Sequence, residues 1–202
     1  MGGIMSIILQ GSTSGSVTLQ EPAVAGTTVL TLPAVSGTVL TTGSSGQIIP
    51  KAALPTGSVL QVVQAQKIDV FSTTSTSYTD ITGLSVSITP TASSSKFLIL
   101  ISVEVGPDGS NFAPMKLVRN STDIAYPSPT TTYDGSVNSF PSNSLSLSSY
   151  ALNWLDSPAT TSATTYKLQM YTTGATAYVN RRASATDNTR TVSTLTVMEI
   201  AA

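Results

Sequence analysis

Carboxylates are the side chains in this sequence that could support catalysis. The chain has ten Asp and Glu residues but no His and no Cys. It therefore cannot by itself build a Ser-His or Cys-His nucleophile, a zinc site of the usual kinds or a thiol redox centre. Two carboxylates at a suitable separation could still hydrolyse a glycosidic bond. The spacing of the acidic residues indicates no such pair, although one formed across a subunit interface remains an alternative.

Half of the acidic residues stand in turn-like contexts. The phrases are "GPDGS", "STDIA", "TYDGS", "LDSPA" and "ATDNT", with Asp108, Asp123, Asp134, Asp156 and Asp187. An Asp in such a context accepts hydrogen bonds from nearby backbone N–H groups. We therefore predict that these carboxylates cap turns. We also predict no enzymatic activity, no catalytic or metal-binding residues and no cofactor.

The charge balance limits the partners of the chain. The chain has nine Lys and Arg residues and ten acidic ones, and only 9% of all residues are charged. With a net charge near zero, no electrostatic field attracts nucleic acid or an anionic membrane. The apolar run from Ile4 to Leu9 is far too short to span a bilayer. We expect neither nucleic-acid binding nor membrane insertion.

An eleven-residue repeat organises the N-terminal part of the chain. Gly15, Gly26 and Gly37 are eleven residues apart, and each precedes a short run rich in β-forming residues. Pro22 and Pro33 keep the same spacing. Each unit therefore predicts a strand, a bend at Pro and a turn at Gly. We interpret residues 1–45 as an extended, strand-rich arm.

The arm carries too many apolar residues to remain in water. The ones that we expect to mediate docking and assembly are Val17, Leu19, Val29, Leu30, Leu32, Val39 and Leu40. A strand-rich piece of about 30 residues is marginally stable in water unless it packs on something else. We predict that the arm buries these side chains against copies of itself or a partner. A Gly-, Ser- and Pro-rich linker, residues 46–57, follows.

Residues 58–202 show the pattern of an all-β domain. Eight runs of five to ten residues are separated by Ser, Thr, Asn, Gly or Pro. They are "SVLQVVQAQ", "LSVSITP", "KFLILISVEV", "PMKLVRN", "YALNWLD", "TTYKLQMYTT", "TAYVN" and "STLTVMEI". No stretch shows a sustained helical period. The pattern predicts an antiparallel β-sandwich, jelly-roll-like in form.

Two of these runs predict how their strands are covered. In "LSVSIT", apolar Leu84, Val86 and Ile88 alternate with polar residues, as in a strand buried on one face. Tyr166, Leu168 and Met170 alternate in the same way. The run from Phe97 to Ile101 is apolar on both faces, which favours a central strand covered on both sides.

The longest interruption of the strand pattern is a candidate binding region. Residues 126–144 are rich in Ser, Thr, Asn and Pro and carry Tyr126, Tyr133, Asp134 and Phe140. Long loops on a rigid β scaffold often bind ligands, and aromatic rings with polar groups can stack on a sugar or a protein. We treat these four residues as candidate receptor contacts. The alternative is that the rings fold back and seal the end of the sandwich.

Two other features could serve binding or structure. Arg181 and Arg182 are adjacent basic residues, which could contact an acidic glycan or could serve solubility and pair with Asp187. We include both arginines among the candidate receptor contacts. Trp154 has apolar neighbours, and we expect it in the core or at a subunit interface rather than in a ligand site.

Several phrases of the sequence resemble virion proteins of tailed bacteriophages. The segment "GSTSGSVTLQEPAVAGTTVLTLPAVSGTVLTTG" is similar to the N-terminal segment of tail fibre and related structural proteins. The phrases "GLSVSITPTASSSKFLILISVEV", "LVRNSTDI", "NWLDSPATTSATTYKLQMY" and "STLTVMEI" resemble the C-terminal β domain of many of the same proteins. Together the phrases cover most of the chain.

The resemblance implies a structural or adhesive component on the surface of the phage particle. Such proteins are usually homotrimers, and their first segment docks to baseplate, tail or capsid proteins while the last domain is exposed. This implies a short tail fibre whose head adheres to a glycan or protein of the host surface. A capsid decoration or cement fibre is the alternative, and a polysaccharide-degrading tail enzyme is a second one.

Overall fold

The chain divides into two compact units, Met1–Gln47 and Ile48–Ala202, in the computed structural model. The structure describes residues 6–10, 13–14, 16–20, 54–109, 111–127, 133–139, 146–184 and 189–202. Part of the predicted arm lies outside these ranges, including Val29, Leu30, Leu32, Val39 and Leu40. The predicted arm-to-linker boundary after residue 45 lies outside them as well.

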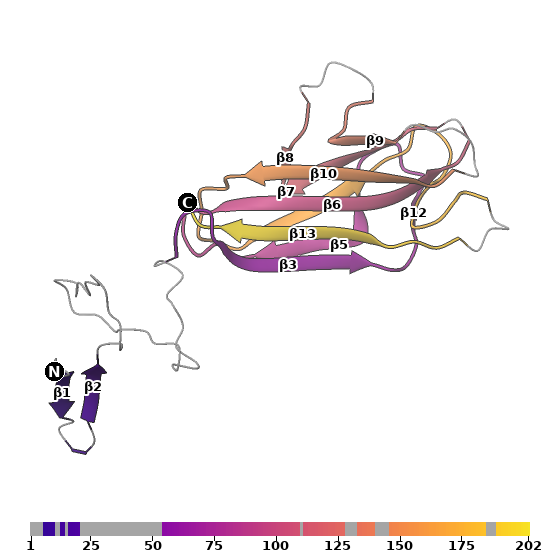
Figure 1. The fold of residues 1–202 in the computed structure, drawn as a ribbon. Helices are drawn as coiled ribbons and strands as arrows, with labels where there is room; N and C mark the ends of the chain where they lie inside the picture. The colour runs from indigo at the N-terminus through magenta and orange to yellow at the C-terminus, as the bar shows by residue number, and fades with distance from the viewer. Residues whose placement is uncertain are drawn as a thin grey trace, which may run out of the picture. The chain divides into compact units, whose positions relative to one another are not determined.

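The described part of the first unit is a two-stranded antiparallel ribbon (Figure 1). Strand β1 spans Ser6–Gln10 and β2 spans Ser16–Gln20. Val17 and Leu19 of the predicted arm lie in β2, opposite Leu9 and Ile7 of β1. A lone hairpin of this length is marginally stable in water. That the arm packs on copies of itself or on a partner stays a prediction.

The second unit is a sandwich of two antiparallel sheets (Figure 1). The six-stranded sheet contains β3 (Val59–Lys67), β13 (Ser193–Ile200), β6 (Lys96–Pro107), β12 (Ala177–Val179) and β4 (Phe71–Thr73) in that order, and β10 (Ser148–Asp156) also pairs with β6. The five-stranded sheet contains β5 (Thr79–Ile88), β11 (Thr164–Met170), β7 (Ala113–Arg119) and β8 (Thr122–Ile124), and β9 (Val137–Ser139) also pairs with β7. No helix occurs among the described residues. The predicted antiparallel β-sandwich is confirmed.

Most hydrogen-bonded neighbours in these sheets are far apart in the sequence, as in Greek-key and jelly-roll sandwiches. All eight predicted head strands occur in the structure. Three further strands, β4, β8 and β9, have only three residues each, which is too short to leave a periodic pattern. The homotrimer stays a prediction.

The hydrophobic core fills the space between the two sheets. Leu84, Val86 and Ile88 of β5 are buried, as the alternation predicts. Tyr166, Leu168 and Met170 of β11 are buried in the same way. From the six-stranded sheet, the core receives Phe97, Ile99, Ile101, Val103, Val105, Ala177, Val179, Leu195 and Val197.

The prediction that both faces of the run Phe97–Ile101 are covered is wrong for the described chain. Phe97, Ile99 and Ile101 are buried, whereas Leu98 and Leu100 point to the outer face and are only half-buried. The five-stranded sheet packs on the inner face of this run of β6. No other described segment of the unit covers its outer face. The outer apolar residues of β6 therefore remain partly in contact with solvent.

The buried Asn180 side chain links three parts of the chain: the residues after β12, the end of β3 and the start of β13. The Asn180 amide donates hydrogen bonds to the backbone carbonyls of Lys67 (2.7 Å) and Asp69 (2.9 Å), and its oxygen accepts one from the Ser193 hydroxyl (2.6 Å). Asn180 has a φ of 65°, a conformation that Asn tolerates better than most residues. This network fixes the chain after β12 against the ends of β3 and β13.

The same chain segment crosses closely over Gly106, so Gly106→Ala is expected to lower the free energy of unfolding by about 1–3 kcal/mol. A Cβ at Gly106 would lie 2.4 Å from the Arg181 carbonyl oxygen and 3.0 Å from the Arg182 Cα. These are backbone atoms that no rotamer change can move. Urea unfolding at one protein concentration measures the loss, with Ser85→Ala on an exposed position of β5 as the control. Equal losses in the two variants would contradict the steric explanation.

Candidate functional site

Three tyrosines gather beside the ends of strands in the five-stranded sheet. Tyr78 immediately precedes β5, Tyr171 immediately follows β11, and Tyr126 lies two residues after β8. The Tyr78 and Tyr171 rings meet edge to face with 4.7 Å between centroids, and Tyr78 and Tyr126 do so at 6.5 Å. We call these three residues the tyrosine cluster. The non-consecutive order of the strands brings them together.

The tyrosine cluster holds the chain before β9 through its hydroxyl groups. The Tyr78 hydroxyl (2.5 Å) and the Tyr126 hydroxyl (3.1 Å) both donate to the backbone carbonyl oxygen of Asp134. Burial raises the pKa of the Tyr78 hydroxyl, and the neighbouring Tyr126 adds to the effect. Burial also raises the pKa of Tyr171. The Tyr78 and Tyr171 hydroxyls therefore remain protonated at physiological pH.

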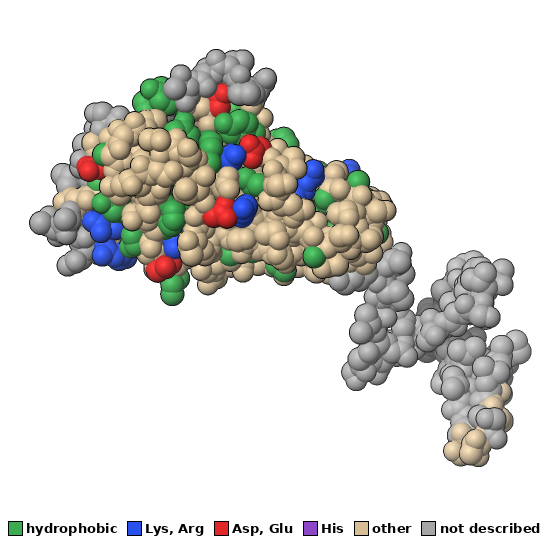
Figure 2. Space-filling view, turned by 180° about the vertical axis from the view of Figure 1, so that it is seen from behind, with side chains coloured by type: hydrophobic (Ala, Val, Ile, Leu, Met, Phe, Trp, Pro, Cys, Tyr) green, Lys and Arg blue, Asp and Glu red, His purple; other side chains and the backbone are tan. Residues whose placement is uncertain are grey.

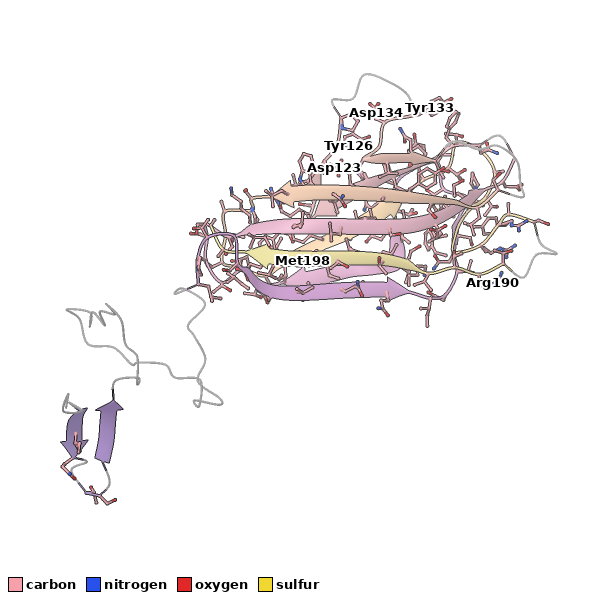
Figure 3. The ribbon with its side chains drawn as sticks, in the orientation of Figure 1. Asp123, Tyr126, Tyr133, Asp134, Arg190 and Met198 are labelled. Carbon is pink, nitrogen blue, oxygen red and sulfur yellow. The ribbon has the colours of Figure 1, made fainter. Side chains whose placement is uncertain are left out.

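A lysine lies over the cluster. The Lys116 Nζ is 4.6 Å from the centroid of the Tyr78 ring and 2.9 Å from the Asp123 carboxylate. The Lys116 side chain is only 16% exposed, so the cation and the ring interact with little intervening water. Figure 3 shows Asp123, Tyr126, Tyr133 and Asp134 on the same side of the sandwich.

The most exposed ring near the cluster belongs to Tyr133. It stacks on Phe112 with 4.6 Å between centroids and an interplanar angle of 21°, and it is 43% exposed. Phe112 lies directly before β7, so a strand end fixes the inner ring of this pair. The outer ring offers an apolar surface with a phenol group. Such a surface can stack on a sugar ring or on an apolar protein side chain.

The outer face of the five-stranded sheet is polar and balanced in charge next to the cluster. Lys167 pairs with Asp80 at 2.9 Å. The Gln169 amide and Lys167 both donate to the Asp80 carboxylate and lower its pKa. Figure 2 shows this side of the molecule, where positive and negative side chains lie next to each other within a largely uncharged surface. Neutral ligands meet no net field here.

The structure brings only some of the predicted receptor contacts together. Tyr126, Tyr133 and Asp134 lie at the tyrosine cluster, where Asp134 contributes its backbone carbonyl. Phe140 lies outside the described residues. The site also contains Tyr78, Tyr171, Phe112 and Lys116, which were not predicted from the sequence. A usable signal was the position of three of these aromatic residues directly before or after a strand.

Arg181 and Arg182 lie away from the cluster, after β12 of the other sheet. The Arg181 guanidinium lies 4.5 Å from the Tyr178 ring centroid and donates to the backbone carbonyls of Arg182, Ala183 and Ser184. This arginine therefore organises its own loop. Asp187, its predicted partner, lies outside the described residues.

The prediction that Asp123 and Asp156 cap turns is wrong. Asp123 lies in β8 and pairs with Lys116. Asp156 ends β10, is buried, and accepts hydrogen bonds from Arg119 and Tyr166. Each carboxylate is engaged by side chains on other strands, and the local sequence does not reveal that pairing.

Trp154 does not belong to the core. It lies in β10, opposite Ile99 of β6, and is 40% exposed at the edge of the six-stranded sheet. That Trp154 lies at a subunit interface stays a prediction.

The described residues contain no group of three or more His, Cys, Asp or Glu side chains arranged to hold a metal ion. No described helix is long and apolar enough to cross a membrane. A small cavity of about 130 Å³ lies at the end where the chain enters the sandwich, lined by Leu54, Thr91, Ala92, Ser94, Ser95, Ala201 and Ala202. Its lining carries no charged side chain.

Comparison with known proteins finds distant structural similarity. The sequence matches no protein-family profile and no curated protein. The fold is similar to a chain in the structure of infectious bursal disease virus, Gx strain, with a TM-score of 0.35 and 14% sequence identity. The match covers 98% of this chain and 51% of the other one, so this chain spans about half the length of its match. We transfer no residue role from it.

Proposed function

We propose that this chain is a structural protein of a tailed-phage particle, a short tail fibre without enzymatic activity. Residues 1–45 dock to other virion proteins, and the β-sandwich projects as a head that adheres to the host surface. The chain acts as a homotrimer, so that three weak contacts combine into stable attachment. The resemblance of its sequence phrases to those of phage fibre proteins supports this proposal, and so does the β-sandwich of the second unit.

The tyrosine cluster with Tyr133 is the observation that carries the adhesive part of the proposal. It joins an exposed aromatic ring, a rigid support and a surface with balanced charges. Rigid aromatic residues provide contact area at a low cost in conformational entropy. A neutral surface glycan or a protein loop fits these properties better than a highly charged polymer does.

The partners of the carboxylates support a role without catalysis. Asp80, Asp123 and Asp156 pair with basic side chains, and Glu199 accepts several hydrogen bonds. A general acid needs a raised pKa, whereas the pKa values of Asp80 and Glu199 are lowered. Release of reducing ends from host polysaccharide by the purified chain would contradict the proposal and favour the tail-enzyme alternative.

Removal of residues 1–45 tests the docking function. The shortened chain is expected to keep the β-sheet circular-dichroism signal of the head but to be absent from purified particles. Incorporation without these residues would refute the assignment. Antibody labelling of intact particles against the head then locates the protein. Label on the tail supports the fibre, whereas label on the shell would replace it with the capsid-decoration alternative.

Tyr133→Ala is expected to weaken binding of the full chain to bacterial cells about tenfold, because a stacked ring contributes on the order of 1 kcal/mol at each contact. Co-sedimentation with a panel of strains measures retention. Val192→Ala is the control, since Val192 is 51% exposed and lies beside β13 of the other sheet. Equal retention of both variants would contradict the role of Tyr133. If the unaltered chain binds none of the strains, the proposed adhesion is contradicted.

A further inference from the structure

The outer face of the six-stranded sheet is nearly free of charge across β3, β13, β6 and β10. The strand register places its outward side chains in rows across β3, β13, β6 and β10. The charged residues among these outward positions are Lys96 in the first row and Glu104 in the last. Gln64, Gln66 and Thr196 lie in the intervening rows and hydrogen-bond to one another. The outer face of the other sheet, in contrast, carries two ion pairs.

An apolar row crosses this face from one edge strand to the other. Val62 lies opposite Met198, Met198 opposite Leu98, and Leu98 opposite Leu155. Val62 and Leu155 are each 54% exposed. Met198 and Leu98 are half-buried between them, and Figure 3 labels Met198 on this sheet. We call these four residues the apolar row.

Beside the apolar row, Leu100 extends the apolar surface. Leu100 of β6 points outward in the next row and is half-buried. Contiguous apolar surface rimmed by polar residues is typical of a protein interface.

We propose that the outer face of β3, β13, β6 and β10 is the contact surface between copies of this chain, with Met198 beside a three-fold axis that runs along the strands. The proposal rests on the homotrimer of the proposed function and names the surface that forms it. Residues next to such an axis meet their own equivalents from the other two copies. The apolar row then forms a belt around the axis, and Leu98 and Leu100 become covered.

The charge pattern favours a second copy of the chain as the occupant. Equivalent residues that meet at a symmetry axis repel each other if they are charged. The apolar row and the next two rows toward Glu104 carry no charge, and Lys96 lies in the row on the other side. The entrance to the sandwich agrees with the axis direction. The Gly57 N–H donates to the Ala201 carbonyl, so the chain enters at the same end of the strands as its last residues. An axis along the strands brings three such entrances to one end, where three arms can dock together.

Single cysteines test the position of the axis, because the chain contains no cysteine of its own. Met198→Cys in the full chain is expected to give a covalent dimer as the main product on oxidation, seen by non-reducing electrophoresis. A disulfide requires Cα atoms within about 7 Å, and a short bis-maleimide serves as a second cross-linker. Ser85→Cys, on the outer face of the other sheet, is expected to give only the band of the single chain under the same conditions. If neither Met198→Cys nor Leu98→Cys forms a cross-linked dimer, the proposal is overturned.

A charge at the same position tests the energetic contribution of the face. Met198→Glu is expected to raise the concentration at which half of the oligomer dissociates at least tenfold, measured by light scattering after size-exclusion chromatography. Ser85→Glu adds the same charge to the other sheet and is expected to leave that concentration unchanged. Circular dichroism confirms that both variants are folded. An unaltered chain that stays monomeric, or a Met198→Glu oligomer as stable as the unaltered one, would overturn the proposal. A stable Met198→Glu oligomer would still leave virion docking and adhesion in place.

Discussion

Glu199→Gln is expected to lower the free energy of unfolding by about 3 kcal/mol at neutral pH. Glu199 is fully buried in β13, and its carboxylate accepts hydrogen bonds from the Thr91 N–H (2.6 Å) and the Ser95 hydroxyl (2.7 Å). It also accepts one from the Gln61 amide (2.5 Å) and a second from Thr91, through its hydroxyl (2.9 Å). A glutamine turns an amino group toward one pair of these donors. Two hydrogen bonds to a charged group are then lost, each contributing about 1.5–3 kcal/mol.

The pH dependence of stability separates the charge of Glu199 from its shape. Burial alone would raise the pKa of the Glu199 carboxyl, but the hydrogen bonds from Ser95, Thr91 and Gln61 together hold it below the usual 4.5. A carboxyl with a lower pKa in the folded state contributes stability that is complete above the unfolded pKa and is lost as the pH falls through the folded one. The unaltered chain therefore loses this contribution below about pH 4.5. Glu199→Gln never has it.

Urea unfolding between about pH 7 and pH 3 measures this difference. The stability of Glu199→Gln is expected to depend less on acid, with a residual dependence because Asp80 keeps its lowered pKa. The gap between the two proteins should therefore narrow as the pH falls. Asp80→Asn is the control, because Asp80 is exposed and pairs with Lys167 at the surface, and it is expected to cost less than 1 kcal/mol. Parallel acid curves for the unaltered chain and Glu199→Gln would contradict the assignment of the charge.

The long strands of the sandwich were predictable because each leaves a period of two in the sequence. Leu84, Val86 and Ile88 show the inner face of β5 directly. The apolar run of β6 has no such period, and the sequence could not show that one of its faces lacks a cover within the described unit. Sheet order is also absent from the sequence, since β13 separates β3 from β6 through contacts between residues far apart in the chain.

The candidate site was only partly predictable because tertiary contacts create it. Tyr126 and Tyr133 could be found as aromatic residues in a long polar segment. Tyr78 and Tyr171 stand at strand ends that become neighbours only when β5 pairs with β11. The sequence around Lys116 likewise gives no sign that its charge lies over a ring from another strand. Strand ends deserve the same search for aromatic residues as loops do.

Asp156→Ala is expected to lower the free energy of unfolding by about 3–5 kcal/mol, because it removes the shared partner of two groups in the opposite sheet. The Arg119 guanidinium donates to both Asp156 carboxylate oxygens at 2.8 and 2.9 Å, and the Tyr166 hydroxyl donates to one of them at 2.7 Å. Asp156 belongs to the six-stranded sheet, whereas Arg119 and Tyr166 belong to the five-stranded one. Burial, followed by the bond to Asp156, raises the pKa of Tyr166. Urea unfolding at pH 7 measures the loss.

A combined variant shows where this cost arises. If the loss comes from leaving a half-buried cation and a buried hydroxyl without a partner, removing those groups as well should restore stability. Asp156→Ala combined with Arg119→Met and Tyr166→Phe is therefore expected to be more stable than Asp156→Ala alone. The comparison is sensitive because Tyr166 is fully buried against Phe97, with 5.9 Å between ring centroids, so little water can replace the lost acceptor. A triple variant less stable than Asp156→Ala would show instead that the three groups stabilise the sandwich mainly through packing, and that the carboxylate is not what joins its two sheets.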